Sequence, residues 1–140
     1  MDHPRIADEA ECQAVLTRFY AYLDERKYTE LAALMARGGE WHRQGKVLNS
    51  PAMIVAELQK RLPTRSIAHL ITNMVVDFPA ADRAALRAYQ TVFAFDDGAM
   101  RSGPAPLGPP NSIARVHVDL VREDGAWRIA LAKSESLFKA

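Results

Sequence analysis

Hydrophobic positions in the first part of the chain recur every three or four residues. One stripe runs from position 7 to about 26 and is formed by Cys12, Leu16, Phe19 and Leu23. This spacing places the apolar side chains on one face and predicts an amphipathic helix.

Two shorter helices are expected next, because each has capping residues at its ends. One begins at Thr29, as N-cap, and ends at the glycine pair 38–39. The other begins at Ser50, as N-cap, has Pro51 at its first helical position and ends at Pro63.

Beyond position 63 the pattern changes to runs that are rich in β-branched and apolar residues, which is typical of strands. Four strands are expected at 65–78, 86–95, 113–121 and 127–137, with a short one at 40–43. Turn-forming residues after the first and third of the long runs favour antiparallel neighbours. Three helices followed by a long antiparallel sheet predict an α+β fold, with residues 1–140 as one domain.

The segment from 97 to 110 is rich in glycine and proline and predicts a long loop. Loops of this length are usually functional or disordered. A connection without a role and a flap over a pocket fit this segment equally well.

The composition is that of a globular protein and argues against several function classes. The chain carries a net charge of +1 with basic and acidic residues interleaved, so no nucleic-acid partner is expected. No run approaches the roughly 18 apolar residues of a membrane span, and the N-terminus lacks an apolar signal segment. We therefore expect a cytoplasmic protein without membrane contact. The single cysteine, Cys12, lies on the apolar helix face, where an inert buried thiol is expected.

Four polar or aromatic side chains interrupt the apolar elements. Tyr20 and Asp24 lie on the first helix, Trp41 follows the second, and His69 lies in the first long strand. Polar groups among apolar neighbours are costly unless they are paired, so they indicate either a hydrogen-bonded core or the lining of a pocket. A histidine in such a place can exchange protons near neutral pH.

Four short motifs connect the chain with a known family. They are Phe-Tyr-Ala-Tyr-Leu-Asp at 19–24, Glu-Trp-His-Arg-Gln-Gly at 40–45, Arg-Ser-Ile-Ala-His at 65–69 and Asp-Gly-Ala-Trp-Arg-Ile at 124–129. With these motifs and this order of elements, the chain resembles the nuclear-transport-factor-two-like superfamily. Within it, the chain is most similar to the SnoaL-like branch, which contains scytalone dehydratase, bile-acid dehydratase and the small subunits of ring-hydroxylating dioxygenases.

The resemblance implies a cone-shaped fold in which three N-terminal helices pack in a curved antiparallel sheet around an internal apolar cavity. It also implies a homodimer formed through the outer sheet face. His69 and Asp24 match the positions of the catalytic His and Asp of the dehydratases, and are the expected catalytic residues. The expected substrate-binding residues are Tyr20, Trp41, Asn73 and Phe19.

Two observations leave the function open. The relatives complete the catalytic set with a further His or Asp on the next strand, where this chain has Gln90, Val92 and Ala94. Asn73 shares a strand face with His69 by parity, and it can either bind a ligand carbonyl or satisfy backbone groups.

The leading hypothesis is a small-molecule lyase or isomerase that transfers a proton on an apolar, cyclic substrate, with His69 as the proton carrier and Asp24 orienting it. The alternative is a non-catalytic ligand-binding or accessory subunit with the same cavity. A third hypothesis is a protein-interaction module that uses the outer sheet. No metal or other cofactor is expected, because no cluster of His, Asp and Glu has the spacing of metal ligands.

Overall fold

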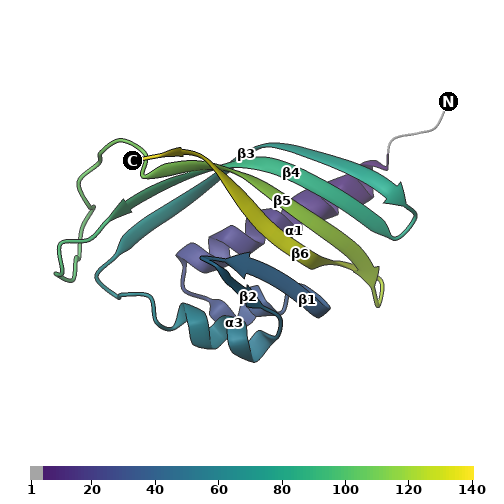
Figure 1. Cartoon of the computed structure of the whole chain (residues 1–140), viewed down its shortest axis with the longest axis horizontal. Coiled ribbons are helices and arrows are strands. Elements are labelled where there is room, and N and C mark those ends of the chain that lie inside the picture. The colour runs from purple at the N-terminus through teal and green to yellow at the C-terminus, as the bar shows by residue number, and fades with distance from the viewer. Residues whose placement is uncertain (1–4) are drawn as a thin grey trace.

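The computed structural model describes residues 5–140, which form one six-stranded sheet and three helices (Figure 1). In chain order the elements are α1 (Ile6–Asp24), α2 (Tyr28–Ala32), β1 (Met35–Arg43), β2 (Lys46–Leu48), α3 (Pro51–Leu58), β3 (Ser66–Ala80), β4 (Arg83–Phe95), β5 (Ser112–Glu123) and β6 (Ala126–Lys139). The predicted α+β fold class is confirmed. Within the described residues, none of the helices is long and apolar enough to span a lipid bilayer.

The strands of the sheet are ordered β2-β1-β6-β5-β4-β3. The four long strands, β3 to β6, lie side by side and are antiparallel, as predicted. β1 forms a hairpin with β2 but pairs in parallel with β6, so the sheet is mixed. The prediction of a purely antiparallel sheet is wrong at this pairing. No turn joins β1 to β6, and the direction of β1 is therefore set by tertiary packing.

The region predicted as the second helix folds differently. The helix α2 has only five residues, and the glycine pair lies inside β1. Gly38 has a φ of +67°, and a Cβ on Gly39 would lie 2.5 Å from the carbonyl oxygen of Ile129 in β6. The register between β1 and β6 shifts at this point. The two glycines therefore permit a bulge and a close approach of two backbones, instead of ending a helix.

The start of α3 follows the sequence prediction. The side chain of Ser50 accepts a hydrogen bond from the backbone N–H of Met53 at 3.2 Å, and Pro51 occupies the first helical turn. The helix ends at Leu58, earlier than the proline that was expected to end it. The prediction of Thr29 as an N-cap is wrong, because α2 already begins one residue earlier.

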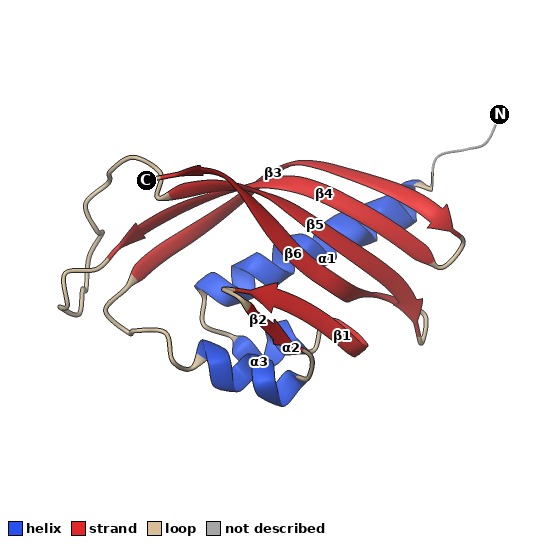
Figure 2. Cartoon of the chain, viewed as in Figure 1, coloured by secondary structure: helices blue, strands red, loops and turns tan. Residues whose placement is uncertain are grey.

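The core lies between α1 and one face of the sheet, and Figure 2 shows this helix beneath the long strands. The inward residues alternate along β4 and β5 and are Ala84, Leu86, Ala88, Val116, Val118 and Leu120. Phe19 and Leu16 on α1 are fully buried against this layer. Each such side chain contributes roughly 1.5–3 kcal/mol through removal of apolar surface from water.

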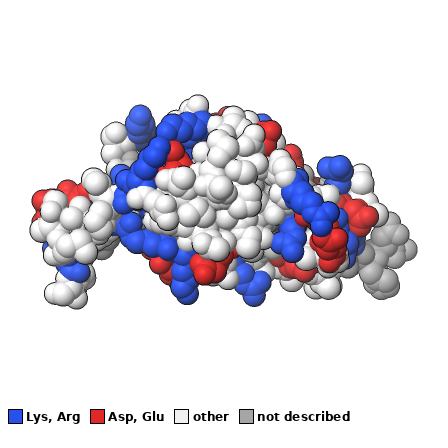
Figure 3. Space-filling view, turned by 90° about the horizontal axis from the view of Figure 1, so that it is seen from below, with Lys and Arg blue, Asp and Glu red and all other residues white. Residues whose placement is uncertain are grey.

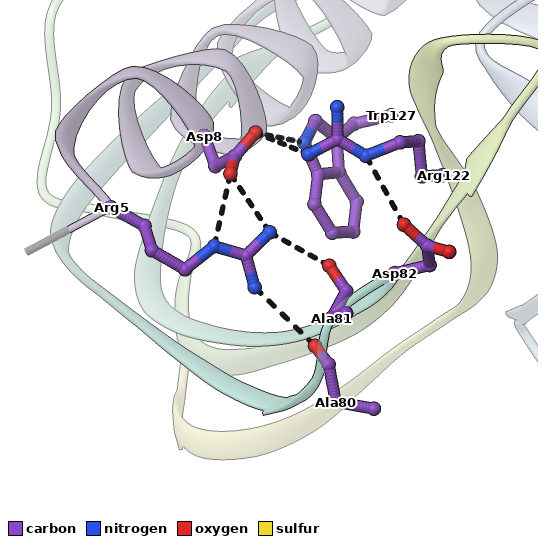
Figure 4. Close-up of polar contacts among 7 residues, drawn as sticks. All are labelled: Arg5, Asp8, Ala80, Ala81, Asp82, Arg122 and Trp127. Carbon is purple, nitrogen blue, oxygen red and sulfur yellow. Dashed lines mark hydrogen bonds and ion pairs between the residues drawn. The ribbon is translucent and has the colours of Figure 1, made fainter.

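A cluster of charged residues attaches the N-terminal end of α1 to the sheet (Figure 4). The Asp8 carboxylate accepts hydrogen bonds from Arg5 at 2.8 Å, Arg122 at 2.5 Å and the indole N–H of Trp127 at 3.0 Å. Arg5 also donates to the carbonyl oxygen of Ala81 in the β3–β4 turn. The hydrogen bonds from the indole and from Arg5 lower the pKa of Asp8 to about 2. The carboxylate therefore stays ionised and joins α1 to the β5–β6 hairpin directly and, through Arg5, to the β3–β4 turn.

The loop predicted at 97–110 connects β4 to β5 and contains neither helix nor strand. Its residues 105–109 line a shallow hollow together with Ala68, Phe93 and Phe95, whose side chains lie on the outer side of the sheet. The backbone N–H of Asn111 donates to the carbonyl oxygen of Val92 at 2.7 Å, where the loop rejoins the sheet. The loop therefore packs on the outside of β3 and β4.

Candidate active site

Asp24 and His69 meet where the last residue of α1 reaches β3. One carboxylate oxygen of Asp24 lies 2.5 Å from Nδ1 of His69, and the other accepts the backbone N–H of His69 at 2.8 Å. An ionised carboxylate can only accept hydrogen bonds, so Nδ1 carries a proton and donates a hydrogen bond to Asp24. This double contact orients the imidazole ring and leaves Nε2 as its other functional atom.

His69 lines a pocket of about 450 Å³, which we call the His69 pocket. The side chain of His69 is 8% exposed and that of Asp24 is 22% exposed, and Asp24 lies outside the pocket wall, behind the histidine. Among the described residues, Nε2 forms no hydrogen bond, yet every fully buried side-chain nitrogen or oxygen has a partner. Nε2 is therefore not sealed in the core and is open to the pocket.

Tyr20 and Trp41 also lie in the pocket wall. The ring of Tyr20 is tilted by 34° against the imidazole of His69, with 5.3 Å between their centroids. Burial raises the pKa of Tyr20, and the nearby Asp24 adds to this while Arg43 opposes it. The phenol therefore stays neutral and can donate a hydrogen bond to a ligand.

Phe19 does not line the His69 pocket, although the sequence suggested contact with substrate. Its side chain is 0% exposed and packs edge-on against Tyr20 and Trp41, at centroid distances of 5.2 Å and 4.9 Å. Successive helical residues are turned by about 100°, so Phe19 points into the core when Tyr20 faces the pocket. Phe19 thus supports the two aromatic wall residues from behind.

Asn73 lies on an exposed part of β3 and away from the pocket wall. Its φ is +55°, and the pairing of β3 with β4 shifts between Thr72 and Val75. This bulge interrupts the alternation of faces, so the expected parity between Asn73 and His69 is wrong.

Gln90 lines the pocket from β4, with 9% exposure, and is directly paired with Ile71. Sequence reasoning named this position only for lacking the titratable group of the relatives. Gln90 lies two residues from both Ala88 and Val92, so all three share one face of the strand. This spacing was the available signal that Gln90 faces inward. Gln90 offers a neutral amide that can both donate and accept hydrogen bonds.

The pocket wall is not uniformly apolar, although an apolar lining was expected. Four basic side chains belong to it, namely Arg43, Lys60, Arg61 and Arg65, and sequence reasoning missed them all. Lys60, Arg61 and Arg65 lie in the connection between α3 and β3, whereas Arg43 ends β1, and no motif joins the two segments. For the part of the chain that the structure describes, no three His, Cys, Asp or Glu side chains come together as a metal site.

The sequence profile of the SnoaL-like domain matches residues 4–133, so the chain belongs to the SnoaL-like domain family. The resemblance to the nuclear-transport-factor-two-like superfamily is thereby confirmed. This family includes dehydratases, cyclases and isomerases. No curated protein sequence matches the chain.

Solved structures with this fold come from several bacteria. An NTF2-like protein from Novosphingobium aromaticivorans is 20% identical, with a TM-score of 0.77 and coverage of 94% of this chain and 83% of that chain. A scytalone-dehydratase-like protein from the same species is 15% identical, with a TM-score of 0.74 and coverage of 95% and 86%. A Catenulispora acidiphila protein in complex with S-DNPA is 25% identical, with a TM-score of 0.72 and coverage of 94% and 95%.

Proposed function

We propose that this protein is a lyase or isomerase that transfers a proton on a small cyclic substrate held in the His69 pocket. The observation that carries the proposal is the Asp24–His69 pair. A carboxylate oxygen of Asp24 lies 2.5 Å from Nδ1 of His69, and Nε2 is left open to the pocket. A pocket of about 450 Å³ has the size of a small-molecule site. The relative from C. acidiphila holds S-DNPA, which supports a ligand in this fold.

In this mechanism Nε2 of His69 removes a proton from the carbon next to a substrate carbonyl. The carboxylate of Asp24 stabilises the imidazolium that forms, because it accepts the Nδ1 proton in a charge-assisted hydrogen bond. The neutral phenol of Tyr20 donates to the developing enolate oxygen, and the amide of Gln90 offers a second polar contact. The proton then returns to another carbon in an isomerisation, or protonates a leaving hydroxyl as water in a dehydration.

A non-catalytic ligand-binding or accessory subunit is the second candidate. The neutral Gln90 favours it, because this side chain cannot serve as the second acid or base that relatives have on this strand. The two candidates differ in one measurable property. An enzyme accelerates proton exchange on a bound ketone, whereas a binding subunit holds the ketone without exchanging its protons.

Deuterium incorporation into 2-tetralone, a bicyclic ketone, separates the two candidates. We expect the wild-type protein in D₂O to accelerate exchange at the carbon next to the carbonyl, followed by NMR, and His69→Gln to return the rate to background. His117→Gln is the matched control, because His117 lies on β5 outside the His69 pocket. Binding of 2-tetralone without accelerated exchange would favour the accessory subunit.

We further propose the homodimer through the outer sheet face. Exposed apolar side chains on this face include Leu70, Tyr89 and Phe138, and Tyr89 and Phe138 line one hollow with Ile113. An apolar patch of this kind is typical of an interface between subunits. Sedimentation at micromolar concentration is expected to give a dimer, and Tyr89→Glu to give a monomer. A wild-type monomer throughout that range would contradict the proposal.

A further inference from the structure

Three arginines reach the wall of the His69 pocket, one from the end of β1 and two from the connection between α3 and β3. Arg43 is the last residue of β1, Arg61 follows α3, and Arg65 immediately precedes β3. Within residues 5–140, none of the three forms an ion pair with a carboxylate. Arginines without a carboxylate partner around a concave site are available to an anionic ligand, since a guanidinium readily forms paired hydrogen bonds with carboxylates and phosphates.

The pocket wall concentrates positive charge. It contains four basic side chains, the three arginines and Lys60, against a single carboxylate, Glu57. Glu57 is already bound by Lys46 at 2.9 Å and Lys60 at 3.0 Å, which hold its pKa down at about 2. The wall therefore has a formal excess of three positive charges, whereas the whole chain has a net charge of +1.

The surface shows the same concentration. In Figure 3, which views the molecule from the side of α3, Lys and Arg side chains gather in an arc between the long loop at the left and the centre of the face. Residues other than Lys, Arg, Asp and Glu fill much of the centre. A concave site bordered by one sign of charge attracts ligands of the opposite sign and raises their local concentration.

Arg43 and Arg61 are held in place before any ligand arrives. Arg61 donates to the carbonyl oxygen of Leu23 at 2.7 Å and to the hydroxyl of Tyr28 at 3.2 Å. The guanidinium of Arg43 lies over the ring of Trp41, 5.4 Å from its centroid. Burial lowers the pKa of Arg43, and the charge of Arg61 lowers it further. Two neighbouring cations in a partly buried place repel each other, and an anion between them would relieve that repulsion.

We propose that the substrate carries an anionic group, a carboxylate or a phosphate, which Arg43, Arg61 and Arg65 bind at the mouth of the His69 pocket. The inference rests on the proposed function, because it assigns the opposite end of the same ligand to Nε2 of His69. Binding energy from the anion then positions the reacting carbon, as contacts remote from the chemistry can do. The substrate class is a small cyclic organic acid or phosphate ester rather than a neutral apolar compound.

Three probes with one ring system test this proposal, namely 2-naphthoate, 2-naphthyl phosphate and the neutral 2-naphthamide. Titration by calorimetry in low-salt buffer is expected to show at least about tenfold tighter binding of one anion than of the amide. The better anion identifies the headgroup as a carboxylate or a phosphate. Added salt is expected to weaken binding of the anion and to leave the amide unaffected.

Substitutions locate the effect. Arg65→Gln and Arg43→Gln are each expected to reduce the preference for the anion by about fivefold or more. Arg65 is exposed, so its replacement leaves a folded protein even where Arg43→Gln is unstable. Arg83→Gln is the matched control, because it removes the same charge from an exposed position at the start of β4, outside the pocket.

The outcomes separate this inference from the proposed function. Equal affinity for all three probes, no binding of either anion, or an unchanged preference in Arg65→Gln would overturn the anion site. His69→Gln is expected to keep the preference for the anion while it loses proton exchange. A preserved anion preference without proton exchange on 2-tetralone in the wild type would favour the binding subunit and keep the anion site as part of it.

Discussion

Each end of α1 carries an aspartate that forms hydrogen bonds to the sheet. The two aspartates differ in whether a hydrogen-bond partner keeps a second polar atom open to a pocket. Asp8 at the first turn accepts from two arginines and an indole, and all of these donors are used to join elements. Asp24 at the last turn accepts both the backbone N–H and Nδ1 of His69. His69 keeps Nε2 open to the His69 pocket, whereas no residue of the N-terminal cluster lines that pocket.

This difference indicates that the two ends of α1 have different roles. The Asp8 cluster holds α1 against the turns of two hairpins, so its loss is expected to appear as lost stability. The Asp24–His69 pair positions one ring, so its loss is expected to appear as lost chemistry. A carboxylate on a helix therefore has no fixed role, because the groups that hydrogen-bond to it decide whether it anchors the fold or orients a reactive side chain.

The largest expected effect is at the chemical end. His69→Gln is expected to reduce proton exchange on 2-tetralone by roughly 100-fold or more, the usual contribution of a positioned acid or base. Asp24→Asn is expected to cost roughly 10- to 100-fold, because it acts through the histidine. Exchange rates measured by NMR, compared with thermal unfolding, check both. A large loss of stability with unchanged exchange in either variant would reverse the assignment of the two ends.

A smaller effect is expected at the anchoring end. Trp127→Phe removes the indole N–H that donates to Asp8 at 3.0 Å and keeps an aromatic ring in the core. Loss of this hydrogen bond to a charged group is expected to lower the free energy of unfolding, because the Asp8 carboxylate loses one of its donors. Denaturant titration measures this change, and proton exchange is expected to be unaffected. The same loss in an Asp8→Ala background, which has no acceptor at this position, would show that the indole does not act through Asp8.

Tyr20→Phe sharpens the comparison within the pocket. It removes one neutral hydroxyl and keeps the ring that packs beside His69, so the fold is expected to be unchanged. Loss of one hydrogen bond to the developing enolate is expected to slow exchange by about tenfold. Tyr22→Phe, on the same helix but outside the pocket wall, is the matched control. Equal rates in both variants would remove Tyr20 from the mechanism.

The smallest effect is a pH dependence at the anchoring end. The pKa of Asp8 is lowered from 3.8 to about 2 in the folded protein. A lowered folded pKa means that the carboxylate stabilises the fold above about pH 4 and loses this contribution as the pH falls towards 2. The difference in unfolding free energy between wild type and Asp8→Asn is therefore expected to shrink across this range. A difference that is constant from pH 5 to 2 would contradict the ionised cluster.

Several elements were predictable because their signals are local. Residues close together in the sequence predict the apolar stripe of α1, the Ser50 cap of α3 and the four long strands. Asp24 and His69 were identified through short motifs, and the structure brings them together. The glycine pair misled because a glycine that ends a helix and a glycine that permits a bulge have the same local appearance.

By itself, the sequence determined the α+β class, the long strands and the two residues of the central pair, because periodicity, capping and short motifs act over neighbouring positions. Only the tertiary structure decided the parallel pairing of β1 with β6, the exposure of Asn73 at a bulge and the meeting of Arg43 with Arg61 and Arg65 at one pocket. The physical reason is that these features depend on distances between segments far apart along the chain. Hydrophobic burial and backbone pairing across the whole domain set those distances, and patterns among neighbouring residues do not predict them.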